Sequence, residues 1–244
     1  MSFDTLAPYY RGMEWVMAGG ILQRCRTSFL AEAANSRRAL LLGEGPGRFL
    51  VELLRMNSSV EITCVERSPR MIAEARSQLT ESELARVKFE QADALSWQPP
   101  RTEFDLVVTN FFLDCFRLEE LRTLVAKIAA SATAEARWLL ADFHEPERGW
   151  RRWRARAVLA LMYGFFRAAT GLSASRLTPP DAFLEAGGFR LASRRLANFG
   201  LAHSDLWLRG GGRSGSPWPQ PLTRLTLEPR DQVAPVPGLP GLGF

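Results

Sequence analysis

The sequence predicts an α/β fold in which a doubly wound, mostly parallel sheet carries helices on both faces. Between residues 39 and 143, short apolar runs alternate with segments of helical spacing, which is typical of a parallel sheet built from βαβ units. Three glycines follow the first apolar run, where a strand would turn into a helix. Two more strand-like runs, ending near residue 209, are separated by a tight turn and indicate an antiparallel pair.

The parallel part of the sheet is expected to contain five strands. Each is a short run of apolar or β-branched residues, and the runs cover 39–42, 61–66, 87–93, 104–110 and 136–143. The segments between them repeat apolar residues at every third or fourth position, which predicts helices at 48–56, 68–79 and 118–132. Ser68 followed by Pro69 is a favourable helix start. A further helical pattern covers 4–34, ahead of the first strand.

The last third of the chain has a different pattern. A helix rich in arginine and aromatic residues is expected over about 148–170, and a short helix follows over 179–188. Two strands then come next, joined by the sequence Asn-Phe-Gly at 198–200. Because the connection is so short, these two strands are expected to be antiparallel to each other.

We expect a single domain over residues 1–209, with an N-terminal helical cap at 1–36 and a helical insertion at 148–178. From residue 210 to residue 244 the chain is dominated by Gly, Pro and short polar residues. Such a segment cannot bury enough apolar surface to offset the entropy of ordering it. Residues 210–244 are therefore expected to form a disordered tail.

The composition excludes several classes of protein. No apolar run approaches the roughly 20 residues that span a bilayer, and the first residues lack the basic start and apolar stretch of a signal peptide. The three cysteines, Cys25, Cys64 and Cys115, are widely spaced and form no C-x-x-C pair, so neither a disulfide framework nor a metal site is expected. A reducing, cytoplasmic location fits this pattern best.

The net charge of +5 raises the question of an acidic partner. Nearly all the basic residues are Arg, since only Lys88 and Lys127 are lysines, and five arginines without any acid stand in 148–156. A uniform Arg bias is also typical of genome composition, so nucleic acid is not the favoured partner. No pattern indicates the oligomeric state.

The three glycines, Gly43, Gly45 and Gly47, predict a ligand site. In open α/β sheets, ligands bind outside the carboxyl ends of the strands, and glycine lets the backbone approach them closely. A dinucleotide site has the pattern G-x-G-x-x-G/A, but Arg48 occupies the sixth position here. Glu44 also places a carboxylate where a pyrophosphate would sit, and a carboxylate instead favours an ammonium or sulfonium group.

Four stretches together resemble the class I S-adenosylmethionine-dependent methyltransferases. They are "LLLGEGPGRFL", "CVERSPRMI", "FEQADALSW" and "FDLVVTNFFLDCF". The resemblance covers residues 37–143, with weaker support to about residue 209. It implies a Rossmann-like, seven-stranded sheet with an antiparallel last strand, S-adenosyl-L-methionine as cofactor, and methyl transfer to a small, hydrophobic acceptor.

The resemblance also implies a role for residues at successive strand ends. The glycines would border the methionine part of the cofactor, Glu66 would hold the ribose hydroxyls, and Asp93 would accept from the adenine amine. About 20 residues separate Gly47 from Glu66, as expected of a ribose-binding acid. The full set of implied cofactor-binding residues is Gly43, Glu44, Gly45, Gly47, Glu66, Arg67, Asp93, Ala94 and Asn110. Read alone, Glu66 could be a solvated strand end and Asp93 a turn residue.

His144 and Asp114 are the candidates for catalysis. Methyl transfer from a sulfonium relies on alignment of the reactants, and a general base is needed only if the nucleophile must lose a proton early. His144 follows the expected strand 136–143, where active sites of the family often face the acceptor. The alternatives are a plain polar loop residue at His144 and a helix-capping Asp114 beside a buried thiol, Cys115. His203 is expected to be structural.

Acceptor binding is expected from Tyr9, Tyr10 and Tyr163, and from the segment 149–172. This segment begins with Arg and Trp and continues with Leu, Met, Tyr and Phe. It could be a lid helix with one apolar face in the core, a helix that makes peripheral contact with a membrane, or an arginine cluster that recruits an anionic acceptor.

Two other functions stay open on the sequence alone. The chain could be a scaffold or sensor that binds S-adenosylmethionine without turnover. It could also be a dinucleotide-dependent oxidoreductase, which Arg48 and Glu44 disfavour.

Overall fold

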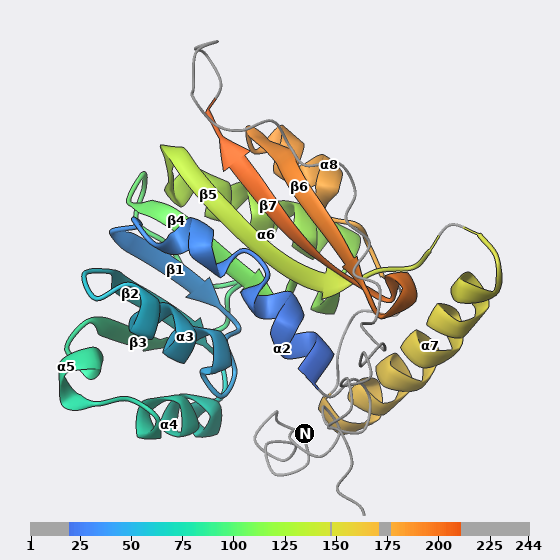
Figure 1. Ribbon diagram of the computed structural model, residues 1–244, viewed down its shortest axis with the longest axis horizontal. Helices are drawn as coiled ribbons and strands as arrows, with labels where there is room; N and C mark the ends of the chain where they lie inside the picture. The colour runs from blue at the N-terminus through green and yellow to red at the C-terminus, as the bar shows by residue number, and fades with distance from the viewer. Residues whose placement is uncertain (1–19, 147, 171–176, 211–244) are drawn as a thin grey trace, which may run out of the picture.

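The computed structural model describes residues 20–146, 148–170 and 177–210, and within 161–170 only the course of the helix (Figure 1). The described strands form one seven-stranded sheet in the order β3-β2-β1-β4-β5-β7-β6. Their bounds are β1 Arg38–Leu42, β2 Glu61–Glu66, β3 Val87–Gln91, β4 Phe104–Asn110, β5 Ala132–Phe143, β6 Phe189–Ala197 and β7 Ala202–Arg209.

The pairing of the strands confirms the predicted fold class. β1 pairs in parallel with both β2 and β4, and β3 and β5 extend the sheet in parallel on either side. β7 is antiparallel to β6, as the short connection between these two strands predicts, and it is also antiparallel to β5. The strand order reverses between β1 and β4, and a crevice at the carboxyl ends of such a pair is the usual ligand site of a doubly wound sheet.

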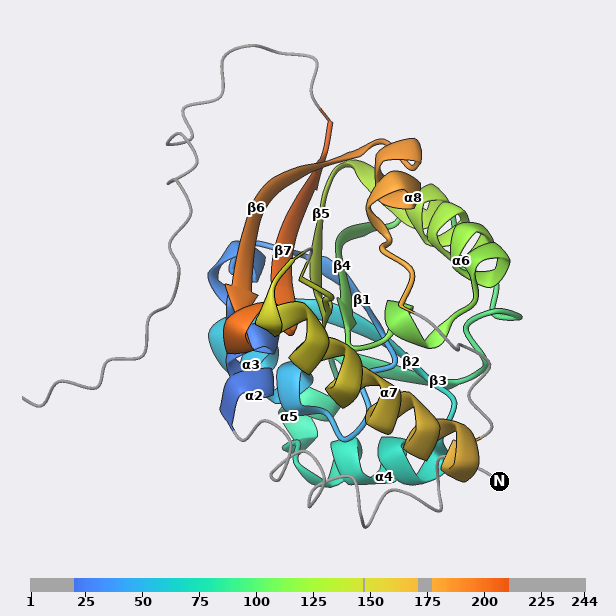
Figure 2. The same ribbon diagram turned by 90° about the vertical axis from the view of Figure 1, so that its right-hand side faces the viewer.

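Helices cover both faces of the sheet (Figure 2). The described helices are α2 Gly20–Thr27, α3 Arg48–Met56, α4 Pro69–Ser77, α5 Glu81–Leu84, α6 Leu118–Ser131, α7 Trp150–Thr170 and α8 Asp181–Ala186. α6 and α8 lie on one face and α2 and α3 on the other. Within the described residues, no helix is both long and apolar enough to cross a membrane.

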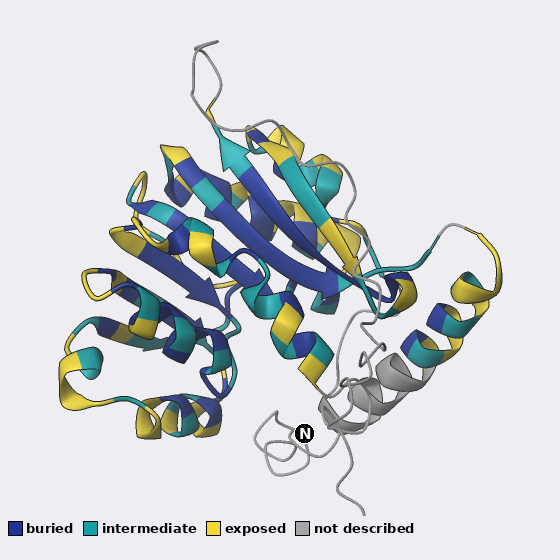
Figure 3. Ribbon diagram, viewed as in Figure 1, coloured by how far each residue is buried: buried dark blue, intermediate teal, exposed yellow. Residues whose placement is uncertain are grey.

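The two faces of the sheet carry separate hydrophobic cores, which follow from the alternation of side chains along a strand. Leu40 and Leu42 of β1 pack in the cluster that includes α6, while Ala39 and Leu41 pack in the cluster that includes α3. Figure 3 shows the central strands almost fully buried. β1 is buried on both sides, so its apolar run is continuous rather than alternating with polar residues.

The segment before β1 differs from its prediction. Instead of one helix to residue 34, α2 ends at Thr27 and a separate 3₁₀ turn covers Leu30–Ala33. The hydroxyls of Thr27 and Ser28 donate to the carbonyls of Gln23 and Arg24, one turn back, and Ser and Thr that bond in this way compete with continued helix. Residues 4–19 lie outside the described residues.

β5 is longer than predicted and starts directly after α6, at Ala132 rather than residue 136. Its first residues, Ala-Thr-Ala-Glu, are not apolar or β-branched enough to predict a strand, but Ala132 pairs with Phe104 of β4. The register shifts between Phe104 and Leu106, so this early pairing depends on an irregularity that the sequence does not reveal.

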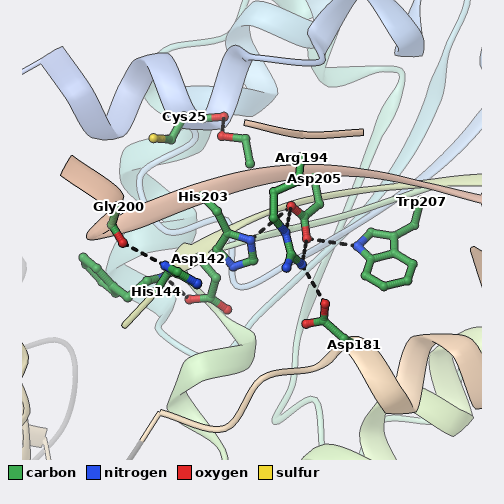
Figure 4. Close-up of polar contacts among 11 residues, drawn as sticks. Cys25, Asp142, His144, Asp181, Arg194, Gly200, His203, Asp205 and Trp207 are labelled. Carbon is green, nitrogen blue, oxygen red and sulfur yellow. Dashed lines mark hydrogen bonds and ion pairs between the residues drawn. The ribbon is translucent and has the colours of Figure 1, made fainter. Parts of the chain in front are cut away.

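A buried network of charges ties β6, β7 and α8 together (Figure 4). Arg194 of β6 donates to both carboxylate oxygens of Asp205 in β7, at 2.8 and 2.6 Å, and reaches Asp181 of α8 at 2.8 Å. His203 Nδ1 lies 3.0 Å from Asp205, and the Trp207 ring N–H donates to it at 3.2 Å. Burial opposes ionisation of Asp205, but the bonds from Arg194 and His203 hold its pKa below the ordinary value.

We predict that Asp205→Ala lowers the free energy of unfolding by about 3–5 kcal/mol, because the buried rings of His203 and Trp207 lose their acceptor and the half-buried Arg194 keeps only Asp181 as its carboxylate partner. Urea denaturation followed by circular dichroism measures this change. The control is Glu119→Ala, which removes an exposed ion pair with Arg122 on α6 and is expected to cost less than about 1 kcal/mol. Equal losses of unfolding free energy in the two variants would contradict the structural role assigned to the Asp205 network.

Candidate functional site

The turn after β1 brings the backbone into an arrangement that only glycine adopts readily. Gly43, Gly45 and Gly47 have φ of +63°, +63° and +86°. A Cβ on Gly43 would lie 2.1 Å from the ring of Phe112, and one on Gly47 would lie 2.9 Å from the Cβ of Ala75 in α4. Gly45 has no heavy atom within 4 Å of that position, so its backbone borders open space. Gly43 and Gly47 therefore allow close packing, whereas Gly45 leaves open space beside the turn.

Gly43 and Gly45 line a cleft at the carboxyl ends of β1 and β4. The empty volume of this cleft is about 290 Å³, including the part that is open to solvent. Its lining consists of Arg26, Gly43, Glu44, Gly45, Pro46, Arg48, Asn110 and Phe111. Gly47 does not line the cleft but faces α4. The cleft thus lies at the point where the strand order reverses, where a doubly wound sheet binds ligands.

Glu44 is turned toward the first turn of α3. Its Oε1 accepts from the backbone N–H groups of Phe49 and Leu50, at 2.7 and 3.0 Å. Burial raises the pKa of Glu44 to about 7, while the two backbone bonds oppose that rise. The carboxylate occupies the free N–H groups at a helix N-terminus, which are the groups that hold pyrophosphate in dinucleotide sites. This geometry agrees with the argument against a dinucleotide.

Glu66, the last residue of β2, is fixed at the rim of the glycine turn. Its Oε2 accepts from the Gly45 N–H at 3.1 Å, and its Oε1 accepts from the Ser68 N–H at 2.9 Å. These two bonds fix the orientation of the Glu66 carboxylate beside the glycine turn.

Asp93, Ala94 and Arg67 lie together after β3. Asp93 Oδ1 accepts from the Leu95 N–H at 2.9 Å and so forms the predicted turn, while Oδ2 lies 3.7 Å from a guanidinium nitrogen of Arg67. Ala94 is buried, and its carbonyl accepts from Lys127 Nζ at 2.7 Å. The side chain of Asp93 is substantially exposed, which leaves it accessible to a ligand.

Lys127 of α6 was missed by sequence reasoning. Its ammonium donates to the carbonyls of Ala94, Leu95 and Trp97, at 2.7 to 2.8 Å, and so holds the loop after β3. Burial lowers the pKa of Lys127, and Asp93 opposes that effect. One indication of its importance was available in the sequence, because Lys127 is one of only two lysines among many arginines.

Asn110, the last residue of β4, and Phe111, which follows it, both line the cleft. Asn110 is buried, and its Nδ2 has no hydrogen-bond partner within the part of the chain that the structure describes. A buried donor of this kind is costly unless a ligand accepts from it. Phe111 has φ of +54°, and the guanidinium of Arg26 from α2 lies 5.1 Å from its ring centre. Arg26 lines the cleft and is a second residue, after Lys127, that sequence reasoning missed.

His144 follows β5 and has a defined tautomer. Its Nδ1 lies 2.8 Å from the carbonyl oxygen of Gly200 (Figure 4). Because a carbonyl only accepts, Nδ1 carries the proton and Nε2 keeps its lone pair. Burial lowers the pKa of His144, and the neighbouring His203 ring lowers it further. The bond to Gly200 acts in the opposite direction. The imidazole is therefore neutral near pH 7.

Asp114 lies in a buried carboxyl pair with Asp142. The Asp114 N–H donates to Asp142 Oδ2 at 3.1 Å, and the Phe143 N–H donates to Asp142 Oδ1 at 2.9 Å. Burial, and next the charge of Asp114, raise the pKa of Asp142 well above its ordinary value. Cys115 Sγ lies 3.6 Å from Asp114 Oδ1, so the expected thiol is beside it. Sequence reasoning missed Asp142 because it stands at the end of an apolar strand, and nothing in the sequence indicates that it pairs with Asp114.

Two pairs of phenylalanines lie at or just after the ends of β4 and β5. The rings of Phe111 and Phe143 are 5.0 Å apart, and those of Phe112 and Phe116 are also 5.0 Å apart. All four are half-buried. Phe111 lines the cleft and Phe112 contacts the glycine turn, so aromatic rings stand beside the cleft.

Three predicted acceptor residues are not placed by the structure. Tyr9 and Tyr10 lie outside the described residues, and Tyr163 falls in the part of α7 whose side chains are not described. Among the described residues, no group of three or more His, Cys, Asp or Glu could hold a metal ion.

Comparison with known proteins decides the family. A family model described as "Methyltransferase domain" matches residues 39–134. A demethylmenaquinone methyltransferase from Deinococcus radiodurans is 30% identical over 215 residues, which cover 82% of this chain and 88% of that protein. The chain belongs to the class I S-adenosylmethionine-dependent methyltransferases. A malonyl-[acyl-carrier protein] O-methyltransferase from Paenibacillus is 32% identical to this methyltransferase over 111 residues, 45% of this chain and 39% of that protein.

Solved structures agree with the fold of this methyltransferase. A mitomycin 7-O-methyltransferase superposes with a TM-score of 0.63 at 20% identity, over 86% of this chain and 61% of that one. A 1,6-didemethyltoxoflavin N1-methyltransferase from Burkholderia thailandensis, with S-adenosylhomocysteine bound, gives a TM-score of 0.61 at 17% identity and covers 86% of both chains. The cofactor is S-adenosyl-L-methionine, and the unpartnered Asn110 amide and the open space beside Gly45 fit a ligand in this cleft.

We predict that Glu66→Ala weakens binding of S-adenosylhomocysteine at least tenfold. Hydrogen bonds to an ionised carboxylate are individually worth about 1.5–3 kcal/mol, and the substitution removes the acceptor for two hydroxyls. Isothermal titration calorimetry measures the affinity, and Glu66→Gln is the milder variant that retains the side-chain shape. Glu61→Ala, at the exposed start of the same strand, is the control and should bind normally. Unchanged affinity in both Glu66 variants would refute the assignment.

Proposed function

We propose that this methyltransferase modifies a small, apolar acceptor that binds at the carboxyl ends of β4 and β5. The single observation that carries the proposal is that half-buried phenylalanines flank the cleft at these strand ends, Phe111 with Phe143 and Phe112 with Phe116. Phe111 lines the cofactor cleft and Phe112 contacts the glycine turn, so an acceptor among these rings lies next to the methyl donor. Aromatic side chains provide large apolar contact surfaces for such a ligand.

The relatives support a small-molecule acceptor. The Deinococcus radiodurans relative is named for demethylmenaquinone, and the Burkholderia thailandensis structure contains 1,6-didemethyltoxoflavin. Neither name is transferred to this chain, since the two acceptors differ from each other. A cytoplasmic location belongs to the same proposal, because the three cysteines are all free, as is usual in a reducing compartment.

The cofactor-binding roles are part of this proposal. Glu66 binds the ribose hydroxyls, Asp93 with Ala94 binds the adenine, and Asn110 donates from its unpartnered amide at the floor of the cleft. When bound, S-adenosylmethionine supplies a methyl group that is already activated by the sulfonium. The contribution of the chain is then to exclude water and to align the acceptor with that methyl group.

His144 is the general base for an acceptor that carries an acidic O–H or N–H. Its Nδ1 proton is held by the Gly200 carbonyl, so Nε2 has the lone pair that can receive a proton. Its lowered pKa keeps it neutral and ready to accept near pH 7. The Asp114–Asp142 pair is buried. Asp142 accepts from the backbone N–H groups of Asp114 and Phe143, so in this proposal the pair supports the backbone after β4 and at the end of β5.

We predict methyl transfer from labelled S-adenosylmethionine to apolar phenols or quinols, and little transfer to charged analogues of the same ring size. The assay uses the full chain and detects labelled product after extraction into organic solvent. S-adenosylhomocysteine should inhibit the reaction. Binding of S-adenosylhomocysteine with no labelled product from any apolar or polar acceptor would favour the non-catalytic sensor instead, and preferential labelling of charged acceptors would refute the apolar site.

We predict that His144→Gln lowers kcat by about 10²–10⁴-fold, the usual contribution of a general base. Its affinity for S-adenosylhomocysteine should be unchanged, because His144 does not line the cleft. In the unsubstituted protein kcat should fall as the pH drops through the pKa of His144, which lies below its ordinary value of 6.5. This acidic limb should be absent in the variant. A normal kcat together with an unchanged pH profile would exclude His144 as the base.

A further inference from the structure

Helix α7 is attached to the domain along only one side. Ala155 and Leu159 are buried, and they pack in a small cluster with Leu201, Phe143 and Val158. Figure 1 shows α7 at the edge of the molecule, outside the sheet and past the end of β5. On the opposite side, the ring of Trp150 lies against that of Phe199, and most of the remaining side chains over 150–160 are exposed.

The outward side of α7 is apolar. Trp150, Trp153, Ala157 and Ala160 are all exposed, and their spacing of three, four and three residues places them on one face. Trp150 is 61% exposed and Trp153 is 73% exposed. Phe199, in the turn between β6 and β7, is 55% exposed, and its ring lies 5.8 Å from that of Trp150. We call Trp150, Trp153 and Phe199 the aromatic patch.

An aromatic patch of this kind requires an explanation. Large exposed apolar surfaces mark interaction sites in folded proteins, and tryptophan is favoured where one side of the surface is apolar and the other is wet. Trp138 and Trp207, by contrast, are fully buried in the core. Figure 3 shows the exposed positions along the outer side of α7.

Positive charge surrounds the aromatic patch. The stretch 144–156 contains five arginines and only two glutamates. Arg152 and Arg156 share one carboxylate, that of Glu145, at 2.9 and 2.8 Å. Arg154 bonds to the neutral side chain of Asn198 at 2.8 Å and lies 5.5 Å from the Phe199 ring centre. These contacts hold the guanidinium groups in place beside the aromatic rings while leaving an excess of positive charge.

We infer that the aromatic patch docks on an anionic lipid surface. Trp and Phe side chains enter the headgroup region, and flanking arginines bind lipid phosphates and carboxylates. The complementary charge favours an anionic membrane over a neutral one, because each basic residue near such a surface contributes about 1 kcal/mol. Two exposed tryptophans on one helical face suit insertion into a planar interface better than the grooves of nucleic acid.

The position of this surface gives it a functional meaning. Glu145, which binds Arg152 and Arg156, directly follows His144. Leu201, which packs against α7, and Gly200, which binds His144, are adjacent in the same turn. Docking would therefore bring the proposed acceptor site close to the lipid. The inference goes beyond the proposed function, because binding to lipid can be measured without any methyl transfer.

The experiment is co-sedimentation of the full chain with vesicles. We expect binding to vesicles that contain phosphatidylserine, weaker binding as salt is added, and little binding to pure phosphatidylcholine. The variant with Trp150→Ser and Trp153→Ser should lose binding at least tenfold. The variant with Arg148→Gln and Arg151→Gln should bind about fivefold more weakly for each arginine removed, which corresponds to about 1 kcal/mol per basic residue.

The control is Leu118→Ser, which removes an exposed apolar side chain on α6, far from the aromatic patch in the sequence, and should bind like the unsubstituted protein. All variants should keep their affinity for S-adenosylhomocysteine and their melting temperature, which shows that they fold. Absence of vesicle binding by the unsubstituted protein overturns the inference, as does equal binding by the tryptophan variant. Salt-sensitive binding to a DNA duplex without vesicle binding would assign the arginines to nucleic acid instead.

Discussion

The approach of Phe112 to Gly43 is the constraint on which the site depends. A Cβ on Gly43 would lie 2.1 Å from the Phe112 ring, so this contact requires glycine at the first position of the turn. It joins the end of β1 to the segment after β4, the two strands between which the order of the sheet reverses. The cleft at the ends of β1 and β4, which Gly43 lines, therefore meets Phe112 at this contact. A side chain at residue 43 would separate them.

The buried acids of the chain are stabilised in three different ways. Glu44 accepts from two N–H groups at the start of α3, and Asp205 is paired with Arg194 and His203. Asp142 has no cation among its bonded partners and lies against Asp114, and its raised pKa favours the protonated form. The arrangement around Asp205 holds a charge in place, whereas burial raises the pKa of Glu44 to about 7 despite its two N–H donors. The pair of Asp142 and Asp114 removes a charge by holding a proton, as two buried carboxyl groups in direct contact must.

The sequence predicted the parts of the site that depend on local chemistry. The glycine turn, the acid that ends β2 and the turn at Asp93 each follow a strand, and a strand end can be located from its apolar run. Arg26, Lys127 and Asp142 could not be predicted in the same way. Each acts through a partner far away in the chain, and a lone charged residue in a helix or strand does not indicate what it contacts.

Boundaries were less predictable than the elements themselves, for a related reason. α2 ends where two hydroxyls bond back to the preceding turn, which is a local effect but competes with a continuing helical pattern. β5 starts early because Ala132 pairs with Phe104, a contact between residues far apart in the sequence. His203 was expected to be structural, and its bond to Asp205 in the buried network agrees with that role.

The positive φ of Phe111 has a geometric consequence. Successive side chains of a strand point to opposite faces of the sheet, yet Asn110 and Phe111 both line the cleft. The left-handed backbone at residue 111 turns the chain out of the strand and makes this possible, at a cost of order 1–3 kcal/mol for a residue other than glycine. One polar and one aromatic group are thereby presented from consecutive positions. The folding free energy of the domain therefore offsets the strain at Phe111, and in return an amide and an aromatic ring stand next to each other in the cleft.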